Sequence, residues 1–590
     1  MASVLQFIEE LRRRNVFRSG AAYVVVAWLL VQASDILLET FAAPAWAMRA
    51  IVIALAVGFP VVLMLAWVYE ITTQGVKRTE AVSEGDSISQ HAGRQIDFVI
   101  IGVLLVGISL FAAERFRWID FGTAPSVDRH SIAVLPLDNL SGDPEQEYFV
   151  DGMTETLIAE LSKISALRVI SRQSVRQFKG TRMPLPEIAK KLNVYWVVEG
   201  SALLIGEQVR ITAQLIEAAT DQNLWADDYD RDLSDVLAIH SEVASAIARE
   251  IHVVVTPEDA ARLADVREVN PVAYTLWLKG NSHLERLNEE SFRRALASYQ
   301  EAIDRDPDYA PAYAGVAMAY LELGGWHASE SPHNVVRLAK KAAEQALALD
   351  PDIAEAHLAL GKIRWLFDWD WAGAERAFEQ GIALNPSDMA GRIAYAGFLT
   401  AMGRFKESIE IGRQTLARDP RSPAAYNELG FALWYAGRDE EALALYREGL
   451  EFDPNFLQSH VLIQLIDVMR GEFDQPLAFL APYLDQVQTL PPVFVGFNGH
   501  IHGLAGRQTE ARAILAVLME RRAQEYVPAS SVADIYIGLG EHDEALRWLE
   551  VAYEERDINL VWLKVGWDFV RLRSDPRFQA ILDRMSFPEP

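Results

Sequence analysis

The sequence of 590 residues contains no cysteine. Disulfide bonds, a thiol nucleophile and cysteine-ligated zinc or iron–sulfur sites are therefore excluded. Positive charge is also scarce, because 55 Lys and Arg residues stand against 82 Asp and Glu residues, which gives a formal net charge of −27. Nearly all of the acidic excess lies beyond residue 130. A segment this acidic repels a phosphate backbone, so we expect no nucleic-acid partner.

Motifs of nucleotide-binding, metal-dependent and hydrolytic enzymes are missing as well. The chain has no G-x-x-x-x-G-K-[ST] loop, no G-x-G-x-x-G after a strand, no H-E-x-x-H and no G-x-S-x-G. The histidines are scattered, and His500 and His502, two residues apart on a predicted helix, point in different directions. We therefore predict a protein that is not an enzyme and has no catalytic residue, no cofactor and no metal site.

Charge is rare in three apolar runs near the N-terminus, at residues 20–38, 48–69 and 96–115. Because a helix needs about 20 apolar residues to cross a bilayer, the runs predict three transmembrane helices. The distribution of basic residues predicts a multi-pass protein of a bacterial inner membrane, with a cytoplasmic N-terminus and with the residues beyond 118 in the periplasm. The basic residues are Arg12, Arg13, Arg14, Arg18, Lys77, Arg78 and Arg94 on the cytoplasmic side, against Arg49, Arg115, Arg117 and Arg129 on the other.

Short apolar runs alternate with helical patterns in residues 131–255. SIAVLPL and LRVISR are typical of buried strands, whereas DGMTETLIAELSKI, LPEIAKKLN and DVLAIHSEVASAIAREI are typical of amphipathic helices. YWVVEGSALLIG and EQVRITAQLIEAAT alternate polar and apolar residues and meet at Gly206-Glu207, which predicts a β-hairpin. The pattern as a whole predicts a small mixed α/β domain.

Five carboxylates crowd the stretch VLPLDNLSGDPEQEYFVDGMTET, between the first predicted strand and the first predicted helix. A calcium loop needs oxygen ligands and a glycine at fixed spacing, and no register of this stretch provides them. A phosphate at the helix start would face several acidic side chains. We interpret Asp151 as the N-cap of the helix and the stretch as a structural turn; contact with a partner and catalysis are the alternatives. The five are Asp138, Asp143, Glu145, Glu147 and Asp151.

The α/β segment also carries a family resemblance. IAVLPLDNLSGDPEQEYFVDGMTETLIAELSKISALRVISR, followed by EGSALLIGEQVRITAQLIEAATDQNLWADDYDRDL, resembles the TolB amino-terminal-like domain. In bacteria this module often stands before tetratricopeptide repeats, and it commonly follows a class III nucleotide cyclase domain or a winged-helix DNA-binding domain, neither of which the sequence before residue 131 resembles. That leading sequence, with LRRRNVFR, AWLL, GFP and LAWVYEITTQGVKR, resembles membrane-bound members of the group. The resemblance implies an architecture rather than an activity.

Proline and glycine recur with a period near 34 residues in the second half of the chain. Within residues 423–454, the small residues Gly430, Ala442 and Gly449 would let two helices approach closely, and Gly437 would turn the chain between them. This pattern resembles the tetratricopeptide repeat. About eight units begin near residues 276, 310, 354, 389, 423, 457, 491 and 526, and the tail WDFVRLRSDPRFQAILDRM is expected to cap the stack.

The resemblance implies a superhelical solenoid whose first helices line a concave groove. By analogy with the family, twelve residues of three middle repeats are candidates for this groove. Trp365, Phe431 and Trp434 could anchor an extended peptide or a partner helix, or they could pack between repeats. The candidates are Glu355, Leu358, Lys362, Trp365, Ala390, Ile393, Gly397, Thr400, Ala424, Asn427, Phe431 and Trp434.

Together these observations predict a multi-domain protein with an N-terminal membrane region (1–118), an α/β domain (131–255) and an all-α tetratricopeptide solenoid (270–590). The predicted function is a membrane-anchored scaffold that binds protein or peptide partners through the groove. The alternative is a sensory or regulatory membrane protein that passes an envelope signal to a separate cytoplasmic effector. The sequence leaves open whether the protein is a homo-oligomer.

Overall fold

The computed structural model describes residues 127–264, 268–286, 288–325, 330–386 and 388–588. In the N-terminal region it describes residues 23, 27, 31, 51, 55, 58–60, 62, 64, 69–72 and 75–78. The chain divides into two compact units, residues 1–126 and 127–590. In the first unit, strand β1 (Tyr69–Thr72) and strand β2 (Gly75–Arg78) form an antiparallel hairpin.

The predicted transmembrane helices are contradicted. Along the part of the chain that the structure describes, no helix is both long and apolar enough to cross a membrane. Helix α13 (Pro332–Leu349), the longest described, has 18 residues and carries four charged side chains, whereas a span needs about 20 nearly uncharged residues. The runs at 20–38, 48–69 and 96–115 lie almost entirely outside the described residues. The predicted fold class, in so far as it included N-terminal transmembrane helices, is therefore wrong. The predicted location in a bacterial inner membrane is wrong for the same reason.

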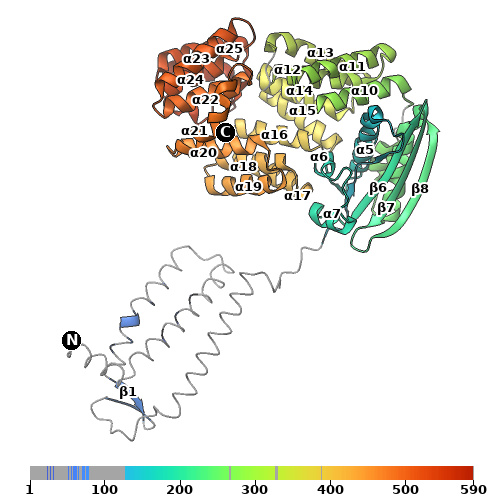
Figure 1. Ribbon diagram of the computed structural model, residues 1–590, viewed down its shortest axis with the longest axis horizontal. Helices are drawn as coiled ribbons and strands as arrows, with labels where there is room; N and C mark the ends of the chain where they lie inside the picture. The colour runs from blue at the N-terminus through green and yellow to red at the C-terminus, as the bar shows by residue number, and fades with distance from the viewer. Residues whose placement is uncertain are drawn as a thin grey trace. The chain divides into compact units, whose positions relative to one another are not determined.

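The second unit begins with a mixed sheet in the strand order β5–β3–β6–β7–β8, with β4 paired to β6 (Figure 1). Strand β3 is parallel to β5 and β6, whereas β6, β7 and β8 are antiparallel. The register pairs Ile205 with Gln208, which confirms the predicted hairpin, and Gly206 takes a φ of 63° in its turn. The strands are β3 (Ser131–Val134), β4 (Asp138–Asn139), β5 (Arg168–Val169), β6 (Trp196–Ile205), β7 (Gln208–Glu217) and β8 (Gln222–Asp232).

Helices cover one face of this sheet. Along β7 the buried residues alternate with more exposed ones, as expected for a strand with one face against a core. The predicted helices are present, although the first begins earlier than expected. The helices of this part are η3 (Pro144–Gln146), α5 (Glu147–Ser162), α6 (Arg172–Arg176), α7 (Leu185–Leu192), η4 (Leu233–Asp235), α8 (Val236–Glu250) and α9 (Pro257–Ala264).

Eight consecutive helix pairs follow within the described residues, in agreement with the predicted all-α array (Figure 1). The pairs are α10 (Pro271–Leu284) with α11 (Glu289–Arg305), α12 (Ala310–Gly324) with α13, α14 (Ala354–Ile363) with α15 (Trp371–Leu384), α16 (Met389–Ala401) with α17 (Phe405–Arg418), α18 (Pro423–Tyr435) with α19 (Asp439–Phe452), α20 (Leu457–Met469) with α21 (Asp474–Leu480), α22 (Pro492–Leu504) with α23 (Gln508–Arg522), and α24 (Ala529–Leu539) with α25 (His542–Glu555). A π-helical turn, η5 (Arg364–Asp368), extends α14, and η6 (Ala481–Gln486) follows the short α21. The chain ends with η7 (Ile558–Trp562), η8 (Asp568–Arg571) and α26 (Pro576–Met585).

Glycines make the tight geometry of each pair possible. Gly437 has a φ of 76° in the turn between α18 and α19, which glycine adopts without strain. A Cβ atom on Gly430 would lie 2.4 Å from the ring of Tyr446, so only glycine lets α18 approach α19 this closely. Both roles agree with the prediction from the sequence.

The α/β part packs directly against the helix pairs. Leu278 of α10 fills the space over Gly152 of α5, where an added Cβ atom would stand 2.5 Å away. Farther along the array, Ser174 Oγ donates a hydrogen bond of 2.8 Å to Asp419 Oδ1, and Ser171 also donates to this carboxylate. Asp419 is fully buried by these contacts. Residues 127–590 therefore form one unit, a union that the sequence pattern does not predict.

Candidate functional site

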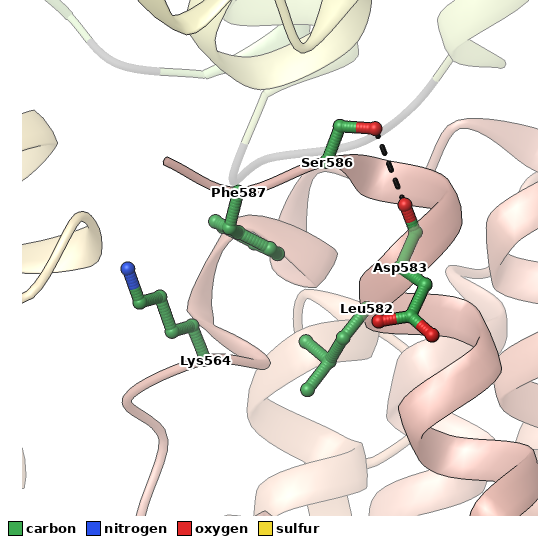
Figure 2. A pocket seen from close by; sticks show the side chains of 5 residues that line it. All are labelled: Lys564, Leu582, Asp583, Ser586 and Phe587. Atoms are coloured by element: carbon green, nitrogen blue, oxygen red, sulfur yellow. Dashed lines mark hydrogen bonds between the residues drawn. The ribbon is translucent and has the colours of Figure 1, made fainter. Parts of the chain in front are cut away.

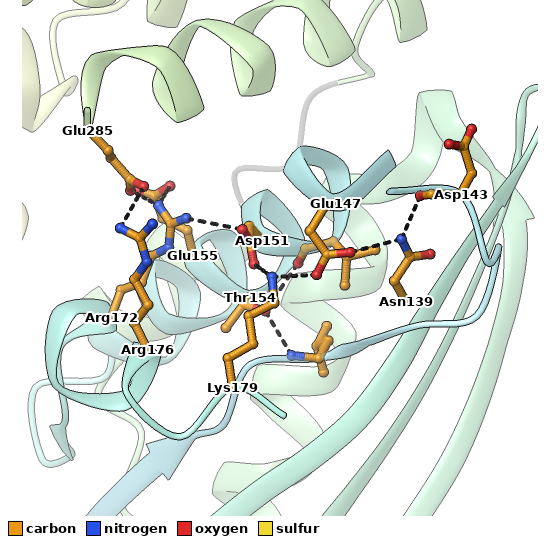
Figure 3. Close-up of polar contacts among 12 residues, drawn as sticks. Asn139, Asp143, Glu147, Asp151, Thr154, Glu155, Arg172, Arg176, Lys179 and Glu285 are labelled. Atoms are coloured by element: carbon orange, nitrogen blue, oxygen red, sulfur yellow. Dashed lines mark hydrogen bonds and ion pairs between the residues drawn. The ribbon is translucent and has the colours of Figure 1, made fainter. Parts of the chain in front are cut away.

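The acidic stretch at the start of α5 forms intramolecular contacts (Figure 3). Asp143 caps η3 by accepting a hydrogen bond of 2.9 Å from the backbone N–H of Glu145. Because α5 begins at Glu147, Asp151 lies inside the helix, and its predicted role as an N-cap is wrong. Asp151 instead accepts a hydrogen bond of 2.5 Å from Lys179, which also pairs with Glu147 and thereby lowers the pKa of Glu147. These contacts hold α5 to the loop after α6.

Some of the predicted groove residues hold helices together. Leu358 is buried, and Cβ atoms added to Gly381 and Gly391 would each lie 2.7 Å from its side chain. Thr400 is fully buried and its Oγ1 lies 2.8 Å from Ser408 Oγ. Asn427 Oδ1 accepts a hydrogen bond of 3.1 Å from Ser459 Oγ on α20.

Other predicted groove residues have solvent access. Glu355 on α14 is exposed, and Lys362 on the same helix is half-buried. Ile393 on α16 is half-buried, as is Ala424 on α18, and Ala390 is exposed. Of this group, Lys362 and Ile393 offer a charged and an apolar side chain that can be changed without opening a core.

The three aromatic candidates meet another part of the chain. We define the C-terminal segment as Ile558–Arg573, which contains η7 and η8. The ring of its Trp562 lies 6.1 Å from that of Trp365 and 5.2 Å from that of Phe431, measured between centroids. The ring of Trp567 lies 6.3 Å from that of Trp434.

Sequence reasoning missed this arrangement. The tail was expected to cap the last repeat, and α26 does pack on α25 through the ion pairs Arg577–Asp543 at 2.7 Å and Arg584–Glu550 at 2.6 Å. The C-terminal segment before α26, however, reaches α14 and α18. The signal that could have revealed it is the run NLVWLKVGWDFV, which is more apolar than an exposed cap requires.

A small open pocket of about 330 Å³ lies beside the C-terminal segment (Figure 2). Lys564 borders it, and the Lys564 Nζ atom donates hydrogen bonds to the carbonyl oxygens of Pro588 at 2.6 Å and Met402 at 3.3 Å. The pocket therefore adjoins the contact between the C-terminal segment and the end of α16. Its lining residues are Lys564, Leu582, Asp583, Ser586 and Phe587.

Two buried polar atoms of the helices that carry the three aromatic candidates have no hydrogen-bond partner among the described residues. They are Trp365 Nε1 and Glu428 Oε1. A Cβ atom added to Gly397 would lie 3.3 Å from the Trp365 ring and 3.5 Å from Glu428 Oε1, so Gly397 borders both residues. Burial raises the pKa of Glu428 to about 8.

The raised pKa of Glu428 predicts a pH-dependent stability. The folded protein holds a proton that the unfolded chain releases, so Glu428 lowers the free energy of unfolding as the pH rises from 4.5 to about 8. We expect Glu428→Gln to leave the free energy of unfolding nearly unchanged at pH 5 and to raise it by about 1–3 kcal/mol at pH 8.5. Tyr446, the neighbouring titratable group on α19, stays neutral across this range because burial raises its pKa.

Urea denaturation at the two pH values measures this difference. Glu451→Gln, on the exposed side of α19, is the matched control and should change neither value. A Glu428→Gln variant with the same pH profile as the unmodified protein would contradict the prediction.

Comparison with known proteins identifies one repeat and finds similar chains. The family model for the tetratricopeptide repeat matches residues 423–456, which contain α18 and α19. A solved structure, a thermophilic tetratricopeptide repeat protein of Thermus thermophilus, is 19% identical and aligns over 32% of this chain and 95% of its own, with a TM-score of 0.28.

Two curated relatives share parts of the sequence. Putative adenylate cyclase 3 of Rhizobium meliloti (strain 1021) is 35% identical over 239 residues, which is 40% of this chain and 40% of the relative. Hsp70-Hsp90 organizing protein 2 of Arabidopsis thaliana is 26% identical over 167 residues, which is 28% of this chain and 29% of the relative. The chain thus spans less than half the length of either. Residues 423–456 form a tetratricopeptide repeat, and the described helices around them continue the same succession of antiparallel pairs.

Proposed function

We propose that this protein is a non-enzymatic scaffold that binds protein partners through the inner surface of its repeats. The proposal treats residues 131–255 as one domain and residues 270–590 as the repeat domain that carries the surface. The residues proposed to form the surface are Glu355, Lys362, Trp365, Ile393, Phe431 and Trp434, with Leu358, Thr400 and Asn427 holding together the helices that carry them.

One observation carries the proposal. Trp365 on η5 belongs to one repeat and Phe431 and Trp434 on α18 belong to another, yet all three contact one stretch of irregular chain, the C-terminal segment. Clustered aromatic side chains supply much of the energy of protein–protein contacts. A surface that already accommodates a segment of this kind is suited to bind a peptide.

The α/β domain has a supporting role in this proposal. Its resemblance to the TolB amino-terminal-like domain implies a fold, and its contacts suggest what the fold does here. It packs on α10 through Gly152 and Leu278 and on the turn after α17 through Asp419. By linking the first repeat to the fourth, it would hold the array at a fixed curvature.

The test is partner capture with variants of accessible residues. We expect the tagged full-length chain to retain a set of proteins that the double variant Lys362→Glu/Ile393→Glu loses at least tenfold, because both changes place negative charge on the surface. Lys341→Glu, on an exposed position of α13, places the Lys→Glu change elsewhere and should keep the partners. Equal recovery by all three proteins would contradict the assignment of the surface.

A second candidate function is the regulation of a separate effector enzyme. The observation in its favour is the 35% identity with a putative adenylate cyclase over 239 residues. Recovery of a nucleotide cyclase with the tagged chain would support it. Formation of cyclic AMP from ATP by the purified chain itself would contradict the proposal that the protein is not an enzyme.

A further inference from the structure

One positively charged side chain is buried in the repeat array. Among the Lys and Arg residues that the structure describes, Arg392 on α16 is the one that is buried, with 7% of its surface exposed. Burial, followed by the charge of Arg418, lowers the pKa of Arg392 to about 10, so the side chain keeps its charge at neutral pH. A buried charge is costly unless an opposite charge is paired with it.

Arg392 has no such partner. Its Nε–H group donates a hydrogen bond of 2.7 Å to the carbonyl oxygen of Pro386, whereas its two Nη groups hydrogen-bond to no described residue and are not sealed from solvent. The charge of the Asp388 carboxylate acts on Arg392, but the two described side chains form no ion pair. Asp388 instead caps α16 by accepting a hydrogen bond of 3.0 Å from the backbone N–H of Gly391. The guanidinium group of Arg392 therefore has unused donors and no paired anion.

The contact between Arg392 and Pro386 does not require a positive charge. In three other repeats the residue six positions after the turn proline also reaches the carbonyl oxygen of that proline. These residues are Tyr313 at 3.1 Å, His357 at 2.8 Å and His460 at 2.8 Å. Because a ring side chain serves this turn equally well, the turn does not explain why an arginine is buried here.

A second arginine lies at the same end of the helix pair. Arg418 is the last residue of α17, and because α16 and α17 are antiparallel it stands beside the start of α16. Arg418 is half-buried, and burial lowers its pKa. Its guanidinium group forms neither an ion pair nor a hydrogen bond with any described residue. We call Arg392 and Arg418 the arginine pair; their like charges repel each other, so an anion between them would be stabilising.

The arginine pair lies where the α/β part meets the fourth repeat. Arg168 Nη1, at the start of β5, donates a hydrogen bond of 3.0 Å to the backbone carbonyl oxygen of Arg418. The residue after Arg418 is Asp419, whose carboxylate accepts hydrogen bonds from two serines of the α/β part. The positive charge of Arg168 is itself offset by Asp128 and Asp419. An anion on the arginine pair would therefore stabilise this junction.

We propose that the arginine pair binds a phosphate group, either free or carried by a small organic molecule. Planar guanidinium groups bind phosphate oxygens through parallel hydrogen bonds, and Arg392 and Arg418 have the unused donors that this requires. Phosphate carries one or two negative charges near neutral pH, which offset the charges of the two arginines. The formal charge of −27 repels a polyanion such as nucleic acid, whereas a single phosphate experiences mainly the local positive charge.

Isothermal titration calorimetry of the full-length chain with inorganic phosphate, in chloride buffer of constant ionic strength, tests this site. We expect a Kd of about 1 mM, because two charge-assisted contacts supply binding of this order. Arg392→Gln and Arg418→Gln should each weaken binding at least about tenfold. Arg413→Gln, on an exposed position of α17, removes a charge from the same helix and should leave the Kd unchanged.

Thermal unfolding provides a second readout. Phosphate should raise the Tm of the unmodified chain and of Arg413→Gln, and it should leave the Tm of Arg392→Gln unchanged. Without phosphate, Arg392→Gln should be at least as stable as the unmodified chain, because it removes an unpaired buried charge. If Arg392→Gln does not fold, Arg418→Gln provides the same comparison at a half-buried position.

Three results would overturn the inference. They are the absence of phosphate binding by the unmodified chain, equal binding by the unmodified chain and both arginine variants, and binding of acetate as tight as that of phosphate. Titration with phenyl phosphate distinguishes the two sources of the group. Binding as tight as that of inorganic phosphate supports a site for an organic phosphate, and much weaker binding supports a site for the free ion.

Discussion

Replacement of Tyr446 by alanine is expected to lower the free energy of unfolding of the repeats by about 3–5 kcal/mol. The Tyr446 ring is fully buried and fills the space over Gly430, where a Cβ atom would lie only 2.4 Å away. Glycine has no side chain that could move into the space, so removal of the ring leaves a cavity between α18 and α19. Urea denaturation followed by far-ultraviolet circular dichroism measures the loss.

Two conservative variants sharpen this prediction. The Tyr446 hydroxyl has no hydrogen-bond partner among the described residues, so Tyr446→Phe should be neutral or slightly stabilising. The equivalent Tyr299 donates a hydrogen bond of 2.8 Å to Asn281 Oδ1, so Tyr299→Phe should cost about 1 kcal/mol. Equal costs for the two variants would show that the two hydroxyls do not differ in this way.

Asp419→Ala is expected to separate the α/β part from the repeats. The Asp419 carboxylate is fully buried and accepts hydrogen bonds from Ser171 and Ser174 of the α/β part. Hydrogen bonds to a charged group are worth more than neutral ones, and loss of the acceptor leaves two hydroxyls unpaired at the contact. We expect a loss of about 2–4 kcal/mol, together with faster proteolysis between α9 and α10. Differential scanning calorimetry should resolve two transitions where the unmodified protein shows one.

The chain provides a matched control for this substitution. Asp453 occupies the same Asp-Pro turn one repeat later and accepts a hydrogen bond of 3.0 Å from the backbone N–H of Asn455. Among the described residues, no hydrogen bond joins the Asp453 carboxylate to the α/β part. Asp453→Ala should therefore remove only the local turn bond and leave a single transition. If Asp453→Ala and Asp419→Ala behave alike, the carboxylate of Asp419 acts in its own turn and does not join the two parts.

The sequence was most informative where local chemistry decides the structure. The 34-residue period, the turn glycines and the small residues of each pair predicted the helix array, and Gly206-Glu207 predicted the hairpin. Strand β8 escaped prediction because QNLWADDYDRD is largely exposed and pairs along its length only with β7. Asp151 was assigned a cap because a sequence shows which residues favour helix ends but does not show that the preceding turn, residues 147–150, already belongs to the helix.

For the apolar N-terminal runs, the prediction from the sequence is wrong. Length and hydropathy predicted transmembrane helices, and the distribution of basic residues predicted a place in a bacterial inner membrane. The finding that no described helix is long and apolar enough to cross a membrane contradicts that assignment.

The sequence by itself determined the repeating helix pairs, since each pair depends on small and large side chains at fixed short spacing. It also named Trp365, Phe431 and Trp434 as candidates for one surface. Only the tertiary structure decided what covers those side chains, because Trp562 lies more than a hundred residues beyond them in the chain. Contacts between such distant positions depend on how the repeats curve, and that curvature is the sum of many small rotations that no single motif encodes.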